Sequence, residues 1–408
     1  MIAKELKEEV YKCIKCGLCL TPCPVYNLLR FEGASPRGRI QLIKKILEGR
    51  AEPSEKFQNL LFTCLLCETC TANCPSGLQT DRLMKAMRTV MQERMGGNWQ
   101  ERILGILPGD KRRLPFFLYC ERTRENLLSS GEGKSGAPSA FEPLRSVSPP
   151  LREQVPEVNP APESKGRVLY FTGCATNYLF PNVGHAVIKV LNRMGMEVIL
   201  PKGQMCCGLP LYQWGGRKAA LKNIRENLKL LNRKDIYAVV VDCASCGAAL
   251  KKEYAHILEE MGENTEPAKE LAEKVVDISQ ILARFDLEKI LKPVEGRVTY
   301  HDPCHLGRSQ GVKEEPRNLL RKIPGLELVE MAGAETCCGG GAALPWEYPE
   351  VASGIGRNKI QSIKETRAGI VASGCPWCRQ QIAENLGQES IRVLHPVEVI
   401  AEALSKQE

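Results

Sequence analysis

The sequence predicts a chain of mixed α+β and α/β class, with a helical N-terminal domain followed by two copies of one α/β domain. Eight cysteines fall in two regular runs near the N-terminus, and the chain after residue 165 repeats with a period of about 130 residues. Within each copy, short apolar runs alternate with helical patterns, which indicates βαβ units. We place the N-terminal domain at 1–120, a linker at 121–165, and the two copies at 166–290 and 291–408.

The N-terminal runs share the spacing Cys-x2-Cys-x2-Cys-x3-Cys-Pro, and they consist of Cys13, Cys16, Cys19 and Cys23, then Cys64, Cys67, Cys70 and Cys74. This is the bacterial ferredoxin spacing, in which three cysteines ligate one [4Fe–4S] cluster and the fourth ligates the other. We therefore assign one cluster to Cys13, Cys16, Cys19 and Cys74, and the other to Cys64, Cys67, Cys70 and Cys23. A structural zinc site is the alternative, but zinc usually takes two pairs of ligands and needs no such run.

The segments around these runs are less regular. Residues 40–48, between the two runs, have the pattern of a helix. Residues 129–136 are rich in Gly and Ser, and prolines follow up to Pro162. Such a composition buries little apolar surface, so we expect the linker at 121–165 to be flexible or extended.

Each copy opens with a short strand that leads to a cysteine: residues 166–170 lead to Cys174, and residues 296–300 lead to Cys304. Further strands are predicted at 197–200, 238–241, 326–329 and 369–372, and a helix at 219–231. A Cys-Cys-Gly and a Cys-x2-Cys follow in each copy, at offsets of 130 to 132 residues between equivalent cysteines. Because parallel sheets collect sites at the carboxyl ends of their strands, we expect these cysteines to gather there.

The patterns Cys-x31-Cys-Cys-Gly-x34-Cys-x2-Cys and Cys-x32-Cys-Cys-Gly-x35-Cys-x2-Cys resemble the cysteine-rich CCG domain. That domain occurs in heterodisulfide reductases and in the iron–sulfur subunits of glycolate and lactate oxidases. With two ferredoxin runs in front, the chain resembles the glycolate oxidase iron–sulfur subunit family over nearly its whole length. The same layout is found in the two-domain catalytic subunit of heterodisulfide reductase.

The resemblance implies one noncubane [4Fe–4S] cluster for each CCG domain. The implied ligands of the first are Cys174, Cys206, Cys207, Cys243 and Cys246, and those of the second are Cys304, Cys337, Cys338, Cys375 and Cys378. Members on the oxidase side often lack some of these cysteines, whereas this chain lacks none. The alternative is that adjacent cysteines form disulfides or simply pack in the core.

The function implied by the resemblance is electron transfer in a flavin-dependent glycolate or lactate dehydrogenase. A separate FAD-containing subunit would oxidise the hydroxyacid, and the clusters would pass electrons to a quinone or a membrane acceptor. We therefore expect the chain alone to be inactive on the hydroxyacid, and we assign it no catalytic residue. The alternatives are reduction of a disulfide at the CCG clusters, as in heterodisulfide reductase, and a non-catalytic docking role.

The sequence pattern also indicates where in the cell the protein works. The first residues show no signal-peptide pattern, and no stretch reaches the ~18–20 apolar residues that span a bilayer. We expect a cytoplasmic protein, with peripheral contact at the cytoplasmic membrane face as the alternative.

The net charge of +8 lies mostly in residues 1–120, which contain 19 Lys and Arg but only 12 Asp and Glu. Basic runs interleaved with aromatics are absent, so nucleic-acid binding is not expected. No G-x-G-x-x-G follows a predicted strand, so flavin or NAD binding is not expected either.

Overall fold

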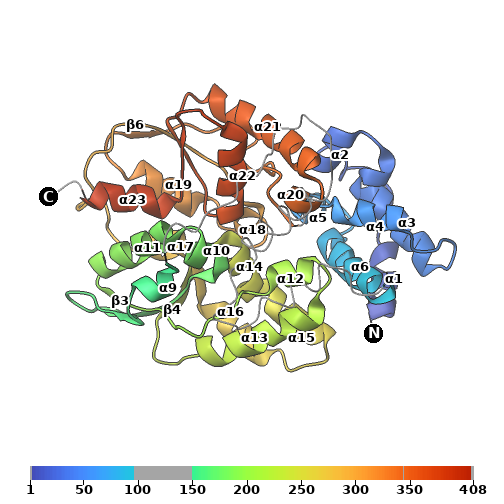
Figure 1. Cartoon of the computed structure of the whole chain (residues 1–408), viewed down its shortest axis with the longest axis horizontal. Helices are drawn as coiled ribbons and strands as arrows, with labels where there is room; N and C mark the ends of the chain where they lie inside the picture. Colours follow the sequence, from blue (N-terminus) through green and yellow to red (C-terminus); the bar gives the residue numbers. More distant parts are fainter. Residues whose placement is uncertain (1, 96–148, 343, 406–408) are drawn as a thin grey trace, which may run out of the picture.

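The computed structural model describes residues 2–95, 149–342 and 344–405. A helical N-terminal domain, blue in Figure 1, lies against two sheet-containing domains, which are coloured green to yellow and orange to red. None of the helices in these ranges is both long enough and apolar enough to cross a bilayer.

The N-terminal domain is built from short helices around one core. They are α1 (Ile2–Tyr11), α2 (Pro24–Leu29), η1 (Glu32–Ala34), α3 (Pro36–Leu47), α4 (Glu55–Phe62), α5 (Thr69–Ala72) and α6 (Thr80–Met95). The helix predicted at 40–48 begins earlier, because the Ser35 hydroxyl caps it by accepting from the Gly38 N–H, with Pro36 at the first helical position. Ile43, Leu61 and Met87 are fully buried where these helices meet.

The first copy holds a five-stranded sheet in the order β1-β3-β2-β4-β5. Its strands are β1 (Val158–Asn159), β2 (Gly166–Phe171), β3 (Met196–Ile199), β4 (Ala238–Val241) and β5 (Val275–Asp277). Its helices are α9 (Leu151–Gln154), α10 (Gly173–Tyr178), α11 (Pro181–Arg193), α12 (Leu209–Gln213), α13 (Arg217–Leu231), α14 (Ala244–Ala248), η2 (Ala249–Glu253), α15 (Tyr254–Glu260), α16 (Glu266–Lys274) and α17 (Ile278–Leu282). Strands β2 to β5 pair in parallel, and β1 adds an antiparallel edge.

The second copy repeats this topology without the edge strand. Its all-parallel sheet has the order β7-β6-β8-β9, formed by β6 (Gly296–Tyr300), β7 (Leu326–Leu328), β8 (Ile370–Ala372) and β9 (Arg392–Leu394). The helices are α18 (Cys304–Gly307), α19 (Glu314–Arg321), α20 (Leu344–Glu347), α21 (Pro349–Glu365), α22 (Pro376–Leu386) and α23 (Pro396–Ser405). The predicted fold class, a helical domain followed by two repeated parallel α/β domains, is therefore confirmed.

The predicted linker overlaps the first sheet. Residues 149–165 include α9, whose Leu151 is fully buried, and β1, which pairs with β3. Leu151 belongs to the same hydrophobic cluster as Val183 and Val187 of α11. Residues 121–148 lie outside the described residues, as does Cys120.

The two copies are held together by an exchange of their last helices. Helix α17 of the first copy packs against α19 of the second, and α23 of the second copy packs against α11 of the first. Ile281, Leu320, Leu191 and Ile400, one from each of these helices, are buried in one shared cluster. This packing joins the two copies and fixes the edges of their sheets, where the cysteines lie, relative to each other.

His395, at the start of α23, makes the stability of the contact between the two copies depend on pH. Its Nδ1 accepts a hydrogen bond from the Val397 N–H at 3.0 Å, and its Nε2–H donates to the Asp242 carbonyl of the first copy at 3.0 Å. The bond at Nδ1 needs the neutral ring, because a protonated Nδ1 has no lone pair with which to accept. Burial lowers its pKa from 6.5 to about 3. The folded state therefore stays unprotonated while the unfolded state takes up a proton, so this contribution to stability is present above pH 6.5 and lost as pH falls towards 3.

We expect His395→Asn, which keeps an N-cap acceptor but cannot titrate, to be destabilised at neutral pH and less so in acid. Between about pH 7 and about pH 5.5 its deficit relative to the native chain should shrink by about 1 kcal/mol. Anaerobic unfolding at the two pH values measures the difference. A deficit that does not change with pH would show that His395 is not buried in its neutral form.

Candidate metal centres

The two N-terminal cysteine runs leave their helices in the same way. Cys13 lies two residues after α1 ends, and Cys64 two residues after α4 ends. Both loops adopt left-handed backbone conformations at equivalent places, two and four residues after the first cysteine: Lys15, Gly17, Leu66 and Glu68. For side chains other than glycine this conformation costs about 1 kcal/mol or more. The shared, strained path curls each loop so that its cysteines face one point.

Each curled loop closes a cavity with one cysteine from the other run. One cavity is lined by Cys13, Cys16, Cys19 and Cys74. The other is lined by Cys23, Cys64 and Cys67. Cys70 lines both cavities. The structure thus brings together the four cysteines that the sequence assigns to each cluster, and the thiol donors fit cubane ligation. Iron binding by these particular sulfurs stays a prediction.

Two buried arginines lie beside the second cavity. Arg39, which lines it, donates to the Leu60 carbonyl at 2.7 Å and to the Thr63 hydroxyl at 2.8 Å. Arg88 donates to the carbonyls of Leu61 and Cys64, each at 2.7 Å. Burial lowers the pKa of Arg88 to about 10, so it keeps its charge at neutral pH. A cluster with four thiolates is anionic, and these fixed cations would offset its charge.

Ligand exchange between the runs can be tested by replacing Cys74 with alanine. We expect loss of the cluster of Cys13, Cys16 and Cys19, about four irons, with the second cluster unchanged, because Cys74 lines only the first cavity. Iron analysis and EPR of the reduced protein measure this. Cys120→Ala, which removes a cysteine outside both runs, is the control. Selective loss of the Cys64–Cys70 signal would reverse the assignment.

Four of the CCG cysteines follow the carboxyl ends of β2, β4, β6 and β8, as the sequence predicts: Cys174, Cys243, Cys304 and Cys375. Within each set the neighbouring thiols interact one after another, in the orders Cys174, Cys206, Cys207, Cys246, Cys243 and Cys304, Cys337, Cys338, Cys378, Cys375. The Cys206 thiol lowers the pKa of Cys207 to about 5, and the Cys337 thiol lowers the pKa of Cys304 to about 7. The eighteen described cysteines, which include both sets, are free thiols. Such dense sulfur sets fit iron–sulfur ligation better than simple packing.

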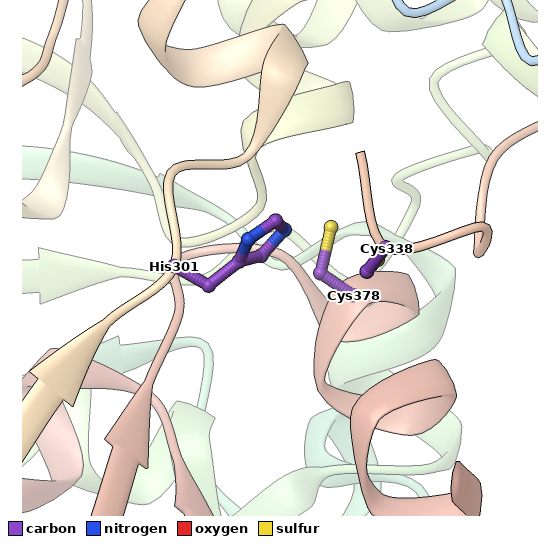
Figure 2. Close-up of side chains that lie close together, drawn as sticks. All are labelled: His301, Cys338 and Cys378. Atoms are coloured by element: carbon purple, nitrogen blue, oxygen red, sulfur yellow. The ribbon is translucent and has the colours of Figure 1, made fainter. Parts of the chain in front are cut away.

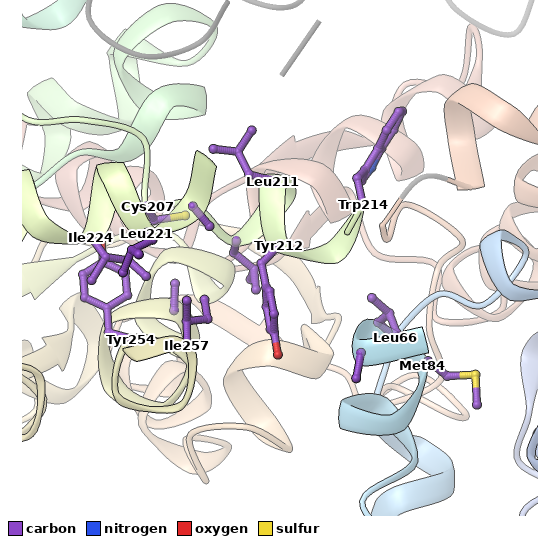
Figure 3. Close-up of a cluster of buried hydrophobic side chains, with 14 of the residues drawn as sticks. Leu66, Met84, Cys207, Leu211, Tyr212, Trp214, Leu221, Ile224, Tyr254 and Ile257 are labelled. Atoms are coloured by element: carbon purple, nitrogen blue, oxygen red, sulfur yellow. The ribbon is translucent and has the colours of Figure 1, made fainter. Parts of the chain in front are cut away.

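The backbone conformation explains why a glycine follows each pair of adjacent cysteines. Gly208 has φ +82° and Gly339 has φ +92°, a region that side chains rarely adopt. A Cβ on Gly339 would also lie 2.5 Å from the Ala352 carbonyl oxygen. In the first copy this turn starts α12 and leaves Cys207 buried beside Leu221, Ile224 and Tyr254 (Figure 3). The glycine is therefore needed to aim the paired cysteines.

The two CCG sets meet at the first cysteines of their Cys-x2-Cys motifs. The thiols of Cys243 and Cys375 lie close enough to shift each other's pKa. The backbone closes the junction, because the Ala244 N–H donates to the Gly374 carbonyl at 2.9 Å. The Ser245 hydroxyl lies 4.0 Å from the Cys375 sulfur and 2.9 Å from Nδ1 of His305. The two CCG sets thus adjoin each other in the buried interior.

The second copy also adjoins the second N-terminal cavity. Arg308, just after α18, donates to the Cys67 carbonyl at 3.2 Å, and the Ser309 hydroxyl donates to the Glu68 carboxylate at 2.7 Å. Burial, and after it the charge of the neighbouring Cys304, raise the pKa of Cys67 to about 12. Cys304 is therefore close to the second cavity on one side and to the Cys337 thiol on the other.

Sequence reasoning missed His301, which follows strand β6. Its Nε2 and the sulfurs of Cys338 and Cys378 all lie within 4.8 Å of one another (Figure 2). A signal was available in the sequence, because His301 lies three residues before Cys304. It becomes visible only when the two copies are aligned, since the first copy has Phe171 at the equivalent position. His305, which directly follows Cys304, has its Nδ1 2.9 Å from the Ser245 hydroxyl.

Comparisons with known proteins agree with this architecture. The family model of the cysteine-rich CCG domain matches residues 168–251 and 298–383, and that of the 4Fe-4S dicluster domain matches residues 9–78. One subunit of the CoM/CoB fumarate reductase of Methanothermobacter marburgensis is 32% identical over 96% of this chain and 72% of its own. A probable glycolate oxidase iron–sulfur subunit of Bacillus subtilis is 29% identical over 98% and 97%.

Two further matches concern a third activity and the fold. One subunit of the dihydromethanophenazine:CoB–CoM heterodisulfide reductase of Methanosarcina barkeri is 29% identical over 97% of this chain and 94% of its own. A crystal structure of a hypothetical protein from Helicobacter pylori shares the fold, with a TM-score of 0.51 at 12% identity over 94% of this chain and 72% of that one. The chain belongs to the family of iron–sulfur proteins that join a 4Fe-4S dicluster domain to two CCG domains, which includes iron–sulfur subunits of glycolate oxidase and subunits of heterodisulfide reductase.

Proposed function

We propose that this chain is the iron–sulfur subunit of a flavin-dependent 2-hydroxyacid dehydrogenase of the glycolate or lactate type. It takes electrons from a FAD-containing partner subunit and passes them to a quinone or another acceptor. It works in the cytoplasm or at the cytoplasmic membrane face. The similarity to a glycolate oxidase iron–sulfur subunit over nearly the full length of both chains supports this proposal.

The observation that carries the proposal is the serial order of the cysteine sets. The first N-terminal set adjoins the second through Cys70, which lines both cavities. The second set adjoins the second copy at Cys67 and Cys304. The second copy adjoins the first copy at Cys375 and Cys243. Such a series suits a relay of single electrons, with four clusters when every set is loaded.

A partner is needed because of the chemistry of the substrate. Removing two electrons and a proton from a carbon that carries a hydroxyl requires a hydride acceptor such as a flavin. Iron–sulfur clusters accept electrons singly. The cysteine sets can therefore carry the electrons onward but cannot by themselves oxidise the hydroxyacid.

The surface beside the first set suits contact with the partner. Cys16 is exposed, and it is flanked by Ile14 and Leu18, whose side chains are 67% and 58% exposed. Exposed Lys12 and Lys15 lie beside them. Apolar side chains with a basic rim would dock a flavoprotein with an acidic rim, and the association should weaken as salt rises.

The test is reconstitution with the FAD-containing subunit under anaerobic conditions. We expect glycolate- or lactate-dependent dye reduction only when both chains are present. Ile14→Glu combined with Leu18→Glu should slow transfer without changing the iron content, whereas Tyr237→Glu, which also changes an exposed hydrophobic residue but in the first copy, should have no effect. Robust hydroxyacid oxidation by the flavin-free chain alone would overturn the proposal.

One observation favours a second candidate, reduction of a disulfide at the CCG centres. Both CCG sets are complete, and they meet at Cys243 and Cys375. Two electrons and two protons convert a disulfide into two thiols, and a pair of adjacent clusters can supply the electrons together. Anaerobic turnover of a CoM/CoB-type heterodisulfide with a reduced dye as donor would favour this candidate over the relay.

A further inference from the structure

The two CCG sets differ in the residue three positions before their first cysteine. His301 follows strand β6 in the second copy, and Phe171 ends strand β2 in the first, three residues before Cys304 and Cys174 respectively. Phe171 is fully buried in the same cluster as Cys207 and Cys246. His301 instead places a nitrogen beside the equivalent cysteines, Cys338 and Cys378. The repeat therefore provides its own comparison: a phenyl ring in one copy and an imidazole in the other.

The imidazole is held in one orientation by the backbone. The His301 N–H donates to the Ala372 carbonyl at 2.9 Å, which continues the pairing of β6 with β8. Its Nδ1 lies 3.0 Å from the Ala334 carbonyl. A carbonyl can only accept, so Nδ1 carries a proton and Nε2 of the neutral ring carries a lone pair. Metal-binding histidines are fixed in this way by a bond from the other ring nitrogen.

The lone pair at Nε2 is directed at the cysteines. His301 is 1% exposed, its Nε2 has no oxygen or nitrogen partner in the described part of the chain, and its side chain interacts with that of Cys338. The groups it faces are the sulfurs of Cys338 and Cys378, with all three atoms within 4.8 Å of one another (Figure 2). Once those sulfurs are thiolates they are acceptors, as Nε2 is. One metal ion between these three atoms would satisfy all of them at once.

We propose that His301 is an iron ligand, so that one iron of the second CCG centre is held by Nε2 of His301 together with Cys338 and Cys378. This inference rests on the proposed function in one respect, namely that the second set binds an iron–sulfur cluster. The first centre, with Phe171 at this position, has sulfur ligands alone. Nitrogen in place of sulfur raises the potential of an iron–sulfur centre, as in Rieske proteins. The second centre is then the one that draws electrons from the N-terminal clusters.

The experiment is ⁵⁷Fe Mössbauer spectroscopy of the anaerobically purified full chain, which detects every iron whatever its spin state. We expect one iron site with mixed nitrogen and sulfur ligands in the native protein. His301→Phe, which installs the residue of the first copy, should abolish that site and lower the potential of the second centre while leaving its cluster in place. Phe171→His should leave the native site intact. Spectra of His301→Phe that superimpose on the native spectra would overturn the proposal.

A second variant separates a ligand from a hydrogen-bond donor. His301→Gln offers an amide N–H to the sulfurs but no imidazole. If His301 is a ligand, this variant should behave like His301→Phe. Retention of the native Mössbauer site and potential in His301→Gln would show that a donor suffices and would overturn the proposal. Pulsed EPR with ¹⁵N-histidine provides a check, since the imidazole coupling should be present in the native protein and absent in His301→Phe.

Failure of the inference can be told apart from failure of the function it rests on. Cys337→Ala combined with Cys338→Ala should lower the iron content if the second set holds a cluster. If iron falls in this variant but His301→Phe changes nothing, only the ligand inference fails. If iron does not fall, or zinc is found in its place, the cluster of the second copy is refuted and the inference fails with it.

Discussion

Replacing Lys85 with methionine should destabilise the folded chain by about 3–5 kcal/mol. Lys85 of α6 lies 3.1 Å from the Asp81 carboxylate and 2.7 Å from the Glu253 carboxylate of the first copy, and none of the three side chains is more than 5% exposed. Burial opposes the charge of Asp81, yet the Lys85 ammonium lowers its pKa to about 2. Without the lysine, two carboxylates remain buried without their shared cation.

Loss of Lys85 should affect more than local stability, because its ion pairs join the N-terminal domain to the first copy. Arg88, one turn further along α6, donates to the Gln213 carbonyl at 2.8 Å, and Gln92 donates to the Trp214 carbonyl at 2.6 Å. Leu66 and Met84 of the N-terminal domain share a hydrophobic cluster with Trp214 (Figure 3). We therefore expect Lys85→Met to loosen the contact that holds the second cavity against the CCG domains.

Anaerobic denaturant unfolding measures the effect, with Lys222→Met as the control. Lys222 is exposed on α13, so its replacement should cost less than about 0.5 kcal/mol. Adding Asp81→Asn and Glu253→Gln to Lys85→Met should recover most of the loss, because the uncompensated charges are then gone. Equal destabilisation by Lys85→Met and Lys222→Met would contradict this account.

The pH dependence of the Lys85→Met defect follows from the same charges. Without the lysine, the buried carboxyl of Asp81 should have a folded-state pKa above its unfolded one. A raised pKa contributes stability below the unfolded value, and that contribution is lost as pH rises. The defect should therefore be smaller at about pH 5 than at about pH 8.

Much of the fold follows from local features of the sequence. Residues 238–241 form β4 as predicted, because four consecutive apolar residues suit a strand buried on both faces. The register of the repeated cysteines predicts two sheets of one topology, and both have it. The sequence did not predict β1, β5 or β9, which have only two or three residues each and are defined by pairing with distant strands.

The parts of the site that escaped prediction depend on contacts between distant segments. The hydrogen bond of Lys85 with Glu253 joins residues 168 positions apart, and no periodic pattern encodes it. The exchange of α17 and α23 between the copies is likewise a property of the assembled repeat. His301 escaped because a lone histidine beside a strand carries no signal until the structure places it against Cys338 and Cys378.

The second large effect concerns the order of the relay. Cys304 of the second copy lies next to Cys67 of the second N-terminal set, whereas the first copy meets the series at Cys243 and Cys375. Electrons that enter at the N-terminal sets should therefore reach the first CCG centre through the second. The two copies have the same topology but occupy different positions in the path of electron transfer.

We expect paired substitutions to expose this difference. Cys337→Ala combined with Cys338→Ala should remove the second CCG centre and abolish reduction of the first, although the ligands of the first are intact. Cys206→Ala combined with Cys207→Ala should remove the first centre and leave the second reducible, because the second lies upstream. In both variants the N-terminal clusters should still pass electrons to a dye. Rapid-freeze EPR after mixing with the reduced flavoprotein partner follows each centre in time. Normal reduction of the first CCG centre in the Cys337/Cys338 variant would show that electrons reach it by another route and would refute the serial order.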